Sequence, residues 1–160
     1  MATSSTTDLW GTIAAEAAEE SPLWGEALRA MPDREREAVF SPLAPDEHRL
    51  GLETIYEGYL VHYGRSRLFA PQDRDTALLL GDYLYAHGLV RIAETGDVKA
   101  VADLAELISR CAHLRAEGRD GDGDGAEWVC TSTSLGLGDS VAADEEAVEA
   151  ALATHARLVG

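Results

Sequence analysis

Apolar residues recur every three or four positions along residues 98–114, and this spacing is the strongest constraint on the fold of the chain. It predicts an amphipathic helix with one buried face. Gly96-Asp97 directly before it is typical of a helix end followed by the N-cap of the next helix. Alternation of apolar and polar residues, which would indicate a sheet, does not extend over several segments. The residues of the apolar face are Val98, Val101, Leu104, Leu107, Ile108, Cys111 and Leu114.

Similar spacing and capping residues predict further helices joined by short links. Asp8 is expected to cap a first helix, and Ser21-Pro22 provides an N-cap and a first helical residue. Longer helices are predicted over residues 46–63, 73–94 and 139–158. The segment 73–94 is apolar on more than one face and is expected to be the most buried helix.

The predicted fold is therefore all-α, a single bundle of about six to seven helices. Residues 1–7 are expected to form a disordered tail, and residues 8–160 one helical domain. A flexible acidic loop is expected at residues 118–127. The stretch 128–138 is rich in Thr, Ser and Gly, and both a loop and a short strand remain open for it.

The charge of the chain excludes some partners. The formal net charge is −16 at pH 7, from 29 acidic residues against 13 Lys and Arg. Such a field repels nucleic-acid phosphates, so no nucleic-acid partner is expected. No apolar run is long enough for a transmembrane segment, and residues 1–7 lack the pattern of a secretory signal. We therefore expect a cytoplasmic protein.

The sequence LLLGDYLYA at residues 78–86 resembles a conserved helix of the trans-isoprenyl (polyprenyl) diphosphate synthase family. In that family a short Gly-Asp or Gly-Asn turn and an amphipathic helix ending near a Glu-Gly step follow. Gly96-Asp97 and Glu117-Gly118 stand at these places. The likeness covers residues 53–118 and extends to the non-catalytic small subunit of heptaprenyl diphosphate synthase. It implies an isoprenoid-synthase-like helical fold in this part of the chain.

The same resemblance implies a degenerate metal site upstream. Counting back from Gly64 places residues 53–57 on the family's first aspartate-rich motif, with Glu53 and Glu57 in place of two aspartates. Carboxylates there would hold the metals that neutralise a diphosphate leaving group. Two interpretations remain open: the two glutamates share one Mg²⁺, or they form a solvated acidic face.

The loop that follows has also diverged from the family. Its two arginines are replaced by His62 and Tyr63, and Arg65 keeps a positive charge where the family has lysine. Loss of the arginine pair removes charge-assisted donors to a diphosphate. The resemblance therefore implies a pseudoenzyme without catalytic residues and without a required cofactor.

Several tyrosines and one histidine cluster in the resembling segments. They would line a pocket for an isoprenoid tail, or they would lie at the rim of the core or of an interface. His87 lies among the apolar residues of the segment 73–94, where a core or interface histidine competes with a ligand role. The residues of this candidate site are Tyr56, Tyr59, Tyr83, Tyr85 and His87.

The segment DGDGDG at residues 120–125 matches the first six positions of a calcium-binding loop. Asp120, Asp122 and Asp124 would be the oxygen ligands. The twelfth position, which normally supplies a bidentate glutamate, is Thr131. A weak calcium site and a flexible acidic linker both remain open.

Two functions follow from these patterns. The first is a non-catalytic isoprenyl-synthase-like accessory protein that associates with a partner subunit, as a hetero- or homo-oligomer, and holds an isoprenoid or quinone tail. The second is a helical structural or interaction subunit of a larger complex, with no ligand. A third is a prenyl transferase that uses Glu53 and Glu57 with Mg²⁺.

Overall fold

The computed structural model describes residues 8–119, 121–135 and 144–159, with the side chains of residues 121 and 122 left out. It confirms the all-α class: within these residues there are seven α-helices and no β-strand. Three short 3₁₀ turns lie between α2 and α3, at Met31–Asp33, Ser41–Leu43 and Asp46–His48. The helices are α1 (Leu9–Glu20), α2 (Pro22–Ala27), α3 (Arg49–Tyr63), α4 (Arg74–Glu94), α5 (Val98–Ala116), α6 (Gly121–Ser134) and α7 (Glu145–Val159). The predicted tail at residues 1–7 lies outside the described residues.

Short polar side chains fix where four helices begin. The side chain of Asp8 accepts a hydrogen bond from the backbone of Gly11, and Ser21 caps α2 in the same way with Pro22 as the first helical residue. Asp73 caps α4 and Asp97 caps α5. The caps at Asp8, Ser21 and Asp97 are predicted from the sequence, and the cap at Asp73 is a further one that the structure shows.

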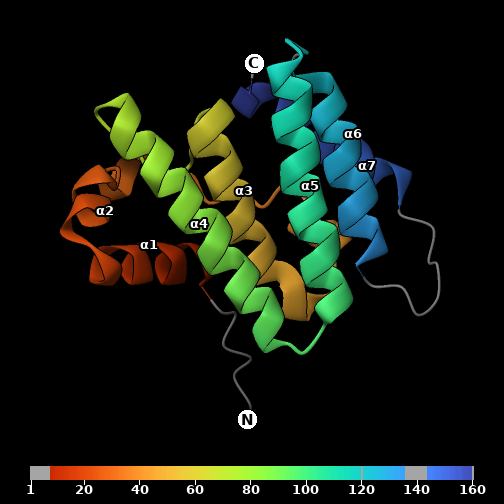
Figure 1. Cartoon of the computed structure of the whole chain (residues 1–160), viewed down its shortest axis with the longest axis horizontal. Coiled ribbons are helices and arrows are strands. Elements are labelled where there is room, and N and C mark those ends of the chain that lie inside the picture. Colours follow the sequence, from red (N-terminus) through yellow and green to blue (C-terminus); the bar gives the residue numbers. More distant parts are fainter. Residues whose placement is uncertain (1–7, 120, 136–143, 160) are drawn as a thin grey trace.

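Helix α3 occupies the centre of the molecule. It packs most extensively against α4, with α1 and α2 on one side of this pair and α5, α6 and α7 on the other (Figure 1). Every residue from Gly51 to Leu60 is buried. The expectation that the segment 73–94 is the most buried helix was therefore wrong: Leu78, Leu79 and Val90 of α4 are 52–57% exposed.

Glycines let α3 and α4 approach each other closely. Gly51 and Gly58 lie two turns apart on α3, and Gly81 and Gly88 have the same spacing on α4. A Cβ atom on Gly88 would lie 2.4 Å from the Cγ1 atom of Ile55 and 3.0 Å from the carbonyl oxygen of Gly51. The backbones are thus in contact at this crossing.

The core has two parts, one on each side of the α3–α4 pair. The larger part joins α3 to α5, α6 and α7 and includes Phe40, Tyr56 and Trp128. The smaller part joins α1 and α2 to α4 and to the loop after α3, with Trp24 and Phe69 among its members. Removal of these side chains from water is the main force that holds the bundle together.

The segment after α5 differs from the sequence prediction. We expected a flexible loop at residues 118–127 and a loop or strand at 128–138, but α6 runs from Gly121 to Ser134. Gly118 has a φ of +74°, which ends α5 in the left-handed conformation that favours glycine. Trp128 is 1% exposed, and its burial in the larger core outweighs the weak helix propensity of the Thr, Ser and Gly residues around it.

Within the described residues, none of the helices combines the length and apolarity that crossing a bilayer requires.

The two cysteines are expected to differ sharply in reactivity. Cys111 is buried in the core, whereas Cys130 is exposed on α6. Burial raises the pKa of the Cys111 thiol to about 12, and the nearby Asp124 carboxylate adds to the shift. Because the thiolate is the reactive form, a thiol reagent at neutral pH should label Cys130 quickly and Cys111 only after unfolding. Timed labelling followed by peptide mass spectrometry checks this, and fast labelling of both cysteines in the native protein would contradict it.

Candidate functional site

A buried ion-pair cluster lies where the resemblance implies a metal site. The guanidinium of Arg67 is 2.7 Å from a carboxylate oxygen of Glu53 and 2.6 Å from one of Glu57. The two glutamates lie one turn apart on the same face of α3, so a single cation can reach both. All three residues are at most 1% exposed.

Backbone amides donate further hydrogen bonds to the two carboxylates. The amide of Val39 donates to Glu53 at 3.3 Å, and the amide of Arg67 donates to Glu57 at 3.2 Å. The hydroxyl of Ser66 also donates to Glu57. The cluster thus joins α3 to the loop before it and to the loop after it.

Two aromatic rings cover the guanidinium. The Arg67 carbon Cζ lies 4.5 Å from the ring centre of Trp10 on α1 and 5.0 Å from that of Tyr56 on α3. Contacts of this kind favour a cation that has lost its water. Burial alone would lower the pKa of Arg67, but the carboxylates of Glu53 and Glu57 outweigh it and raise the pKa above its ordinary value. Arg67 is therefore a permanent cation at this position.

This cluster does not fit a divalent metal. The carboxylates that would hold Mg²⁺ already share the guanidinium of Arg67, and a metal next to a buried guanidinium would meet strong repulsion. Across the described residues, no three or more His, Cys, Asp or Glu side chains converge on a point where a metal ion could bind. The chemistry open to the cluster is thus structural, since its polar atoms face one another and not solvent.

Arg65 lies elsewhere. Its guanidinium pairs at the surface with Glu35, which also pairs with Arg157 of α7. The neighbouring arginines and the hydrogen bonds from them lower the pKa of Glu35. The cation that reaches Glu53 and Glu57 is instead Arg67, which the sequence interpretation missed. The sequence around it gives little signal, because Arg65 and Ser66 precede Arg67 and only the residues after it, Leu68 and Phe69, are apolar.

Tyr56 and Tyr59 lie together in the larger core. Their rings stack with centres 5.7 Å apart, and both contact Trp128 edge-on. The hydroxyl of Tyr56 is 2.7 Å from Nδ1 of His155 on α7. Burial raises the pKa of both tyrosines above its ordinary value. These two tyrosines therefore join α3 to α6 and α7.

The other candidate residues lie in different places. Tyr83 stacks between Trp24 and His87 on the side of α4 that faces α1 and α2, and His87 is 2.9 Å from Glu16. Tyr85 lies on the opposite side, where it lines a surface groove. The structure thus separates the five residues of the expected prenyl pocket into three environments.

The calcium-loop candidate lies at the start of α6. Asp124 is buried, and one of its carboxylate oxygens accepts hydrogen bonds from Tyr59 at 2.5 Å and from Arg115 at 2.9 Å. Asp122 belongs to the first turn of α6, and Asp120 lies outside the described residues. Asp124 thus ties α6 to α3 and α5, and its carboxylate charge is paired with Arg115.

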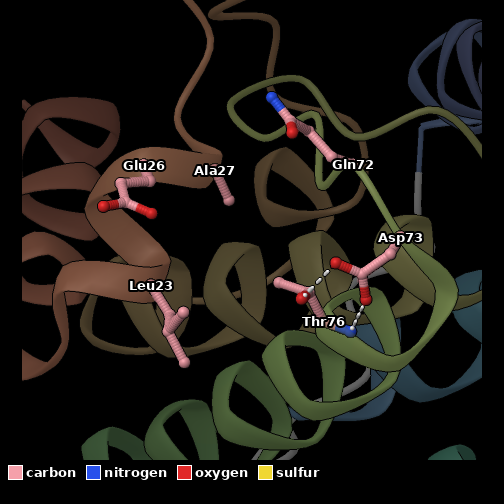
Figure 2. A pocket seen from close by; sticks show the side chains of 6 residues that line it. All are labelled: Leu23, Glu26, Ala27, Gln72, Asp73 and Thr76. Carbon is pink, nitrogen blue, oxygen red and sulfur yellow. Dashed lines mark hydrogen bonds between the residues drawn. The ribbon is translucent and has the colours of Figure 1, made fainter.

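A small hollow separates α2 from the start of α4. Figure 2 shows Leu23, Glu26 and Ala27 on one side of it and Gln72, Asp73 and Thr76 on the other. Two carboxylates border this hollow, but both oxygens of Asp73 accept hydrogen bonds from Thr76 in capping α4 (Figure 2). Its volume of about 140 Å³ is below that of ordinary small-molecule sites. The role that the structure gives to Asp73 beside this hollow is to cap α4.

The fold and the buried cluster define an all-α protein in which two buried carboxylates share one arginine. No protein-family model, curated protein or solved structure matches the chain.

Proposed function

We propose that the chain is a non-catalytic accessory protein, similar to isoprenyl diphosphate synthases over residues 53–118, that associates with a partner subunit. One observation carries this proposal: Arg67 holds the two glutamates that stand at the metal-binding positions of the resemblance. Without free carboxylates, the chain has no means at this site to hold the metals that ionise an allylic diphosphate. The helical bundle would then serve to bind the partner subunit.

Association with a partner is supported by the outer face of α4. Leu79 is 57% exposed and Val90 52% exposed, and Ala86 lies exposed between them. Residues 79, 86 and 90 recur at the seven- and four-residue spacing of a helix-packing seam. The occupant that fits this face is an apolar helix of another subunit, and the net charge of −16 opposes a second copy of this chain.

An isoprenoid or quinone tail is the ligand that goes with this function, and Tyr85 in an open groove supports it. The second candidate is a helical interaction subunit with no ligand, which the exposed face of α4 supports equally. Extraction of the purified protein and mass spectrometry of the extract separate the two. An isoprenoid at a stoichiometric level favours the first, and its absence favours the second.

The test of the catalytic claim uses the isolated chain. It is incubated with an allylic diphosphate, isopentenyl diphosphate and Mg²⁺, and product formation is followed by chromatography. We expect no turnover. We also expect the midpoint of thermal unfolding to be the same in Mg²⁺ as in NaCl of equal ionic strength. Turnover that Glu57→Gln abolishes would overturn the proposal.

The test of association uses co-expression with the product of an adjacent gene. The wild-type chain should co-purify with its partner at fixed stoichiometry, and Leu79→Glu and Val90→Glu should abolish this. Glu94→Gln, on an exposed part of the same helix, is the matched control. Equal recovery of the partner with the wild type and both glutamate variants would exclude the α4 face as the contact surface.

A further inference from the structure

A groove between α3, α4 and α5 has the properties of a ligand site. Its volume is about 450 Å³, in the range of small-molecule pockets, and it is open to solvent. Its apolar wall comes from all three helices and consists of Val61, Ala77, Leu78, Ile108 and Ala112. An apolar chain could lie along this wall and remove both surfaces from water.

One end of the groove carries a cation without a partner. Arg74 is the first residue of α4 and lines the groove, and no described residue forms a hydrogen bond or an ion pair with its guanidinium. In contrast, Arg91, Arg110 and Arg157 are all paired with carboxylates. In a chain with a net charge of −16, an unpaired arginine beside an apolar wall is the natural contact for an anion.

Two tyrosines add neutral donors to the same groove. Tyr63 and Tyr85 both line it, and their hydroxyls form no hydrogen bond with a described residue. Burial raises the pKa of each above its ordinary value, so both hydroxyls keep their protons. They can therefore donate to the oxygen of a ligand.

The remaining polar pair limits the charge of the ligand. Nε2 of His62 lies 3.2 Å from a carboxylate oxygen of Asp82, and both residues line the groove. Burial lowers the pKa of His62, so the imidazole is neutral at pH 7 and adds no second cation to the groove. Arg74 can pair with one negative charge on the ligand, and the carboxylate of Asp82 opposes a second one.

We propose that this groove binds a monoanionic amphiphile, a carboxylate whose apolar chain lies against Leu78 and Ile108 and whose head group pairs with Arg74. The groove is the one in which Tyr85 supports a bound isoprenoid or quinone tail, and the inference assigns it a ligand with a carboxylate head group instead. It does not depend on association with a partner subunit, so either proposal can fail without the other.

Isothermal titration calorimetry with decanoate, below its micelle-forming concentration, tests the proposal. We expect saturable binding at one site per chain, weaker binding of decanol, and no binding of decyltrimethylammonium. Decyl phosphate in its doubly charged form should bind more weakly than decanoate because of Asp82. Equal affinity for the carboxylate and the ammonium would overturn the proposal, as would tighter binding of the phosphate.

Variants at exposed positions locate the site without disturbing the core. Arg74→Gln should weaken decanoate binding about tenfold or more, as expected for loss of a charge-assisted hydrogen bond. Arg36→Gln, which makes the same charge change away from the groove, should leave it unchanged. Ala112→Trp should block the groove, and Ala102→Trp, on the same helix outside it, should not. Unchanged affinity in both Arg74→Gln and Ala112→Trp would refute the site.

Discussion

Replacing Arg67 by alanine is expected to lower the free energy of unfolding by about 3–5 kcal/mol, the usual cost of removing one partner from a buried ion pair. Glu53 and Glu57 would be left as carboxylates that are 1% and 0% exposed, with no cation near them. Urea unfolding at neutral pH, followed by circular dichroism, measures the loss.

Two comparisons make this result specific. Arg65→Ala removes a surface ion pair with a half-exposed guanidinium and should cost less than about 1 kcal/mol. Replacing Arg67, Glu53 and Glu57 together by apolar residues of similar size should recover most of the stability, because no charge is then left buried. A loss below about 1 kcal/mol for Arg67→Ala would show that water reaches the cluster.

Gly88→Ala is expected to lower the free energy of unfolding by about 1–3 kcal/mol, the usual cost of overpacking, even though alanine favours a helix by about 1 kcal/mol over glycine. The added methyl group would lie 2.4 Å from Ile55 and 3.0 Å from the carbonyl oxygen of Gly51. The side chain of Ile55 can turn away, but the backbone carbonyl of Gly51 can move only if α3 and α4 separate. Thermal and urea unfolding measure the effect.

Gly25→Ala is the matched control for this substitution. Gly25 lies within α2, and a Cβ atom there would meet only the side chain and Cα of Ala18, at 3.5 Å and 3.6 Å. Because nothing must move, helix propensity should dominate and the variant should be slightly more stable than the wild type. If Gly88→Ala behaved like Gly25→Ala, the close approach of α3 and α4 would be excluded.

Local signals in the sequence predict much of this fold. The caps at Asp8, Ser21 and Asp97 and the apolar spacing of α5 act within a few residues, so they can be read without the tertiary structure. The extent of α6 could not be predicted in this way. Its helix depends on the burial of Trp128 against distant residues, which the spacing of Thr, Ser and Gly does not reveal.

In the candidate site, too, some features follow from the local sequence and others depend on tertiary contacts. The face shared by Glu53 and Glu57 follows from their spacing, which is four residues. Which cation meets them depends on how the loop after α3 folds back, and there Arg67 and not Arg65 points inward. The five aromatic and histidine residues come from two helices, and positions two apart on a helix face different neighbours. Tyr83 therefore packs against the smaller core, whereas Tyr85 lines the groove on the other side of α4.

The close pairing of α3 with α4 also bears on the order in which the chain can assemble. These helices are consecutive, and the loop between them spans only residues 64–73, so bringing them together costs little chain entropy. The hydrogen bond between the side chains of Tyr56 and His155, in contrast, joins residues 99 positions apart. Docking of the last helix therefore closes a much longer stretch of chain than the pairing of α3 with α4. Until α7 docks, the aromatic side chains that it covers remain open to solvent and to other unfolded chains.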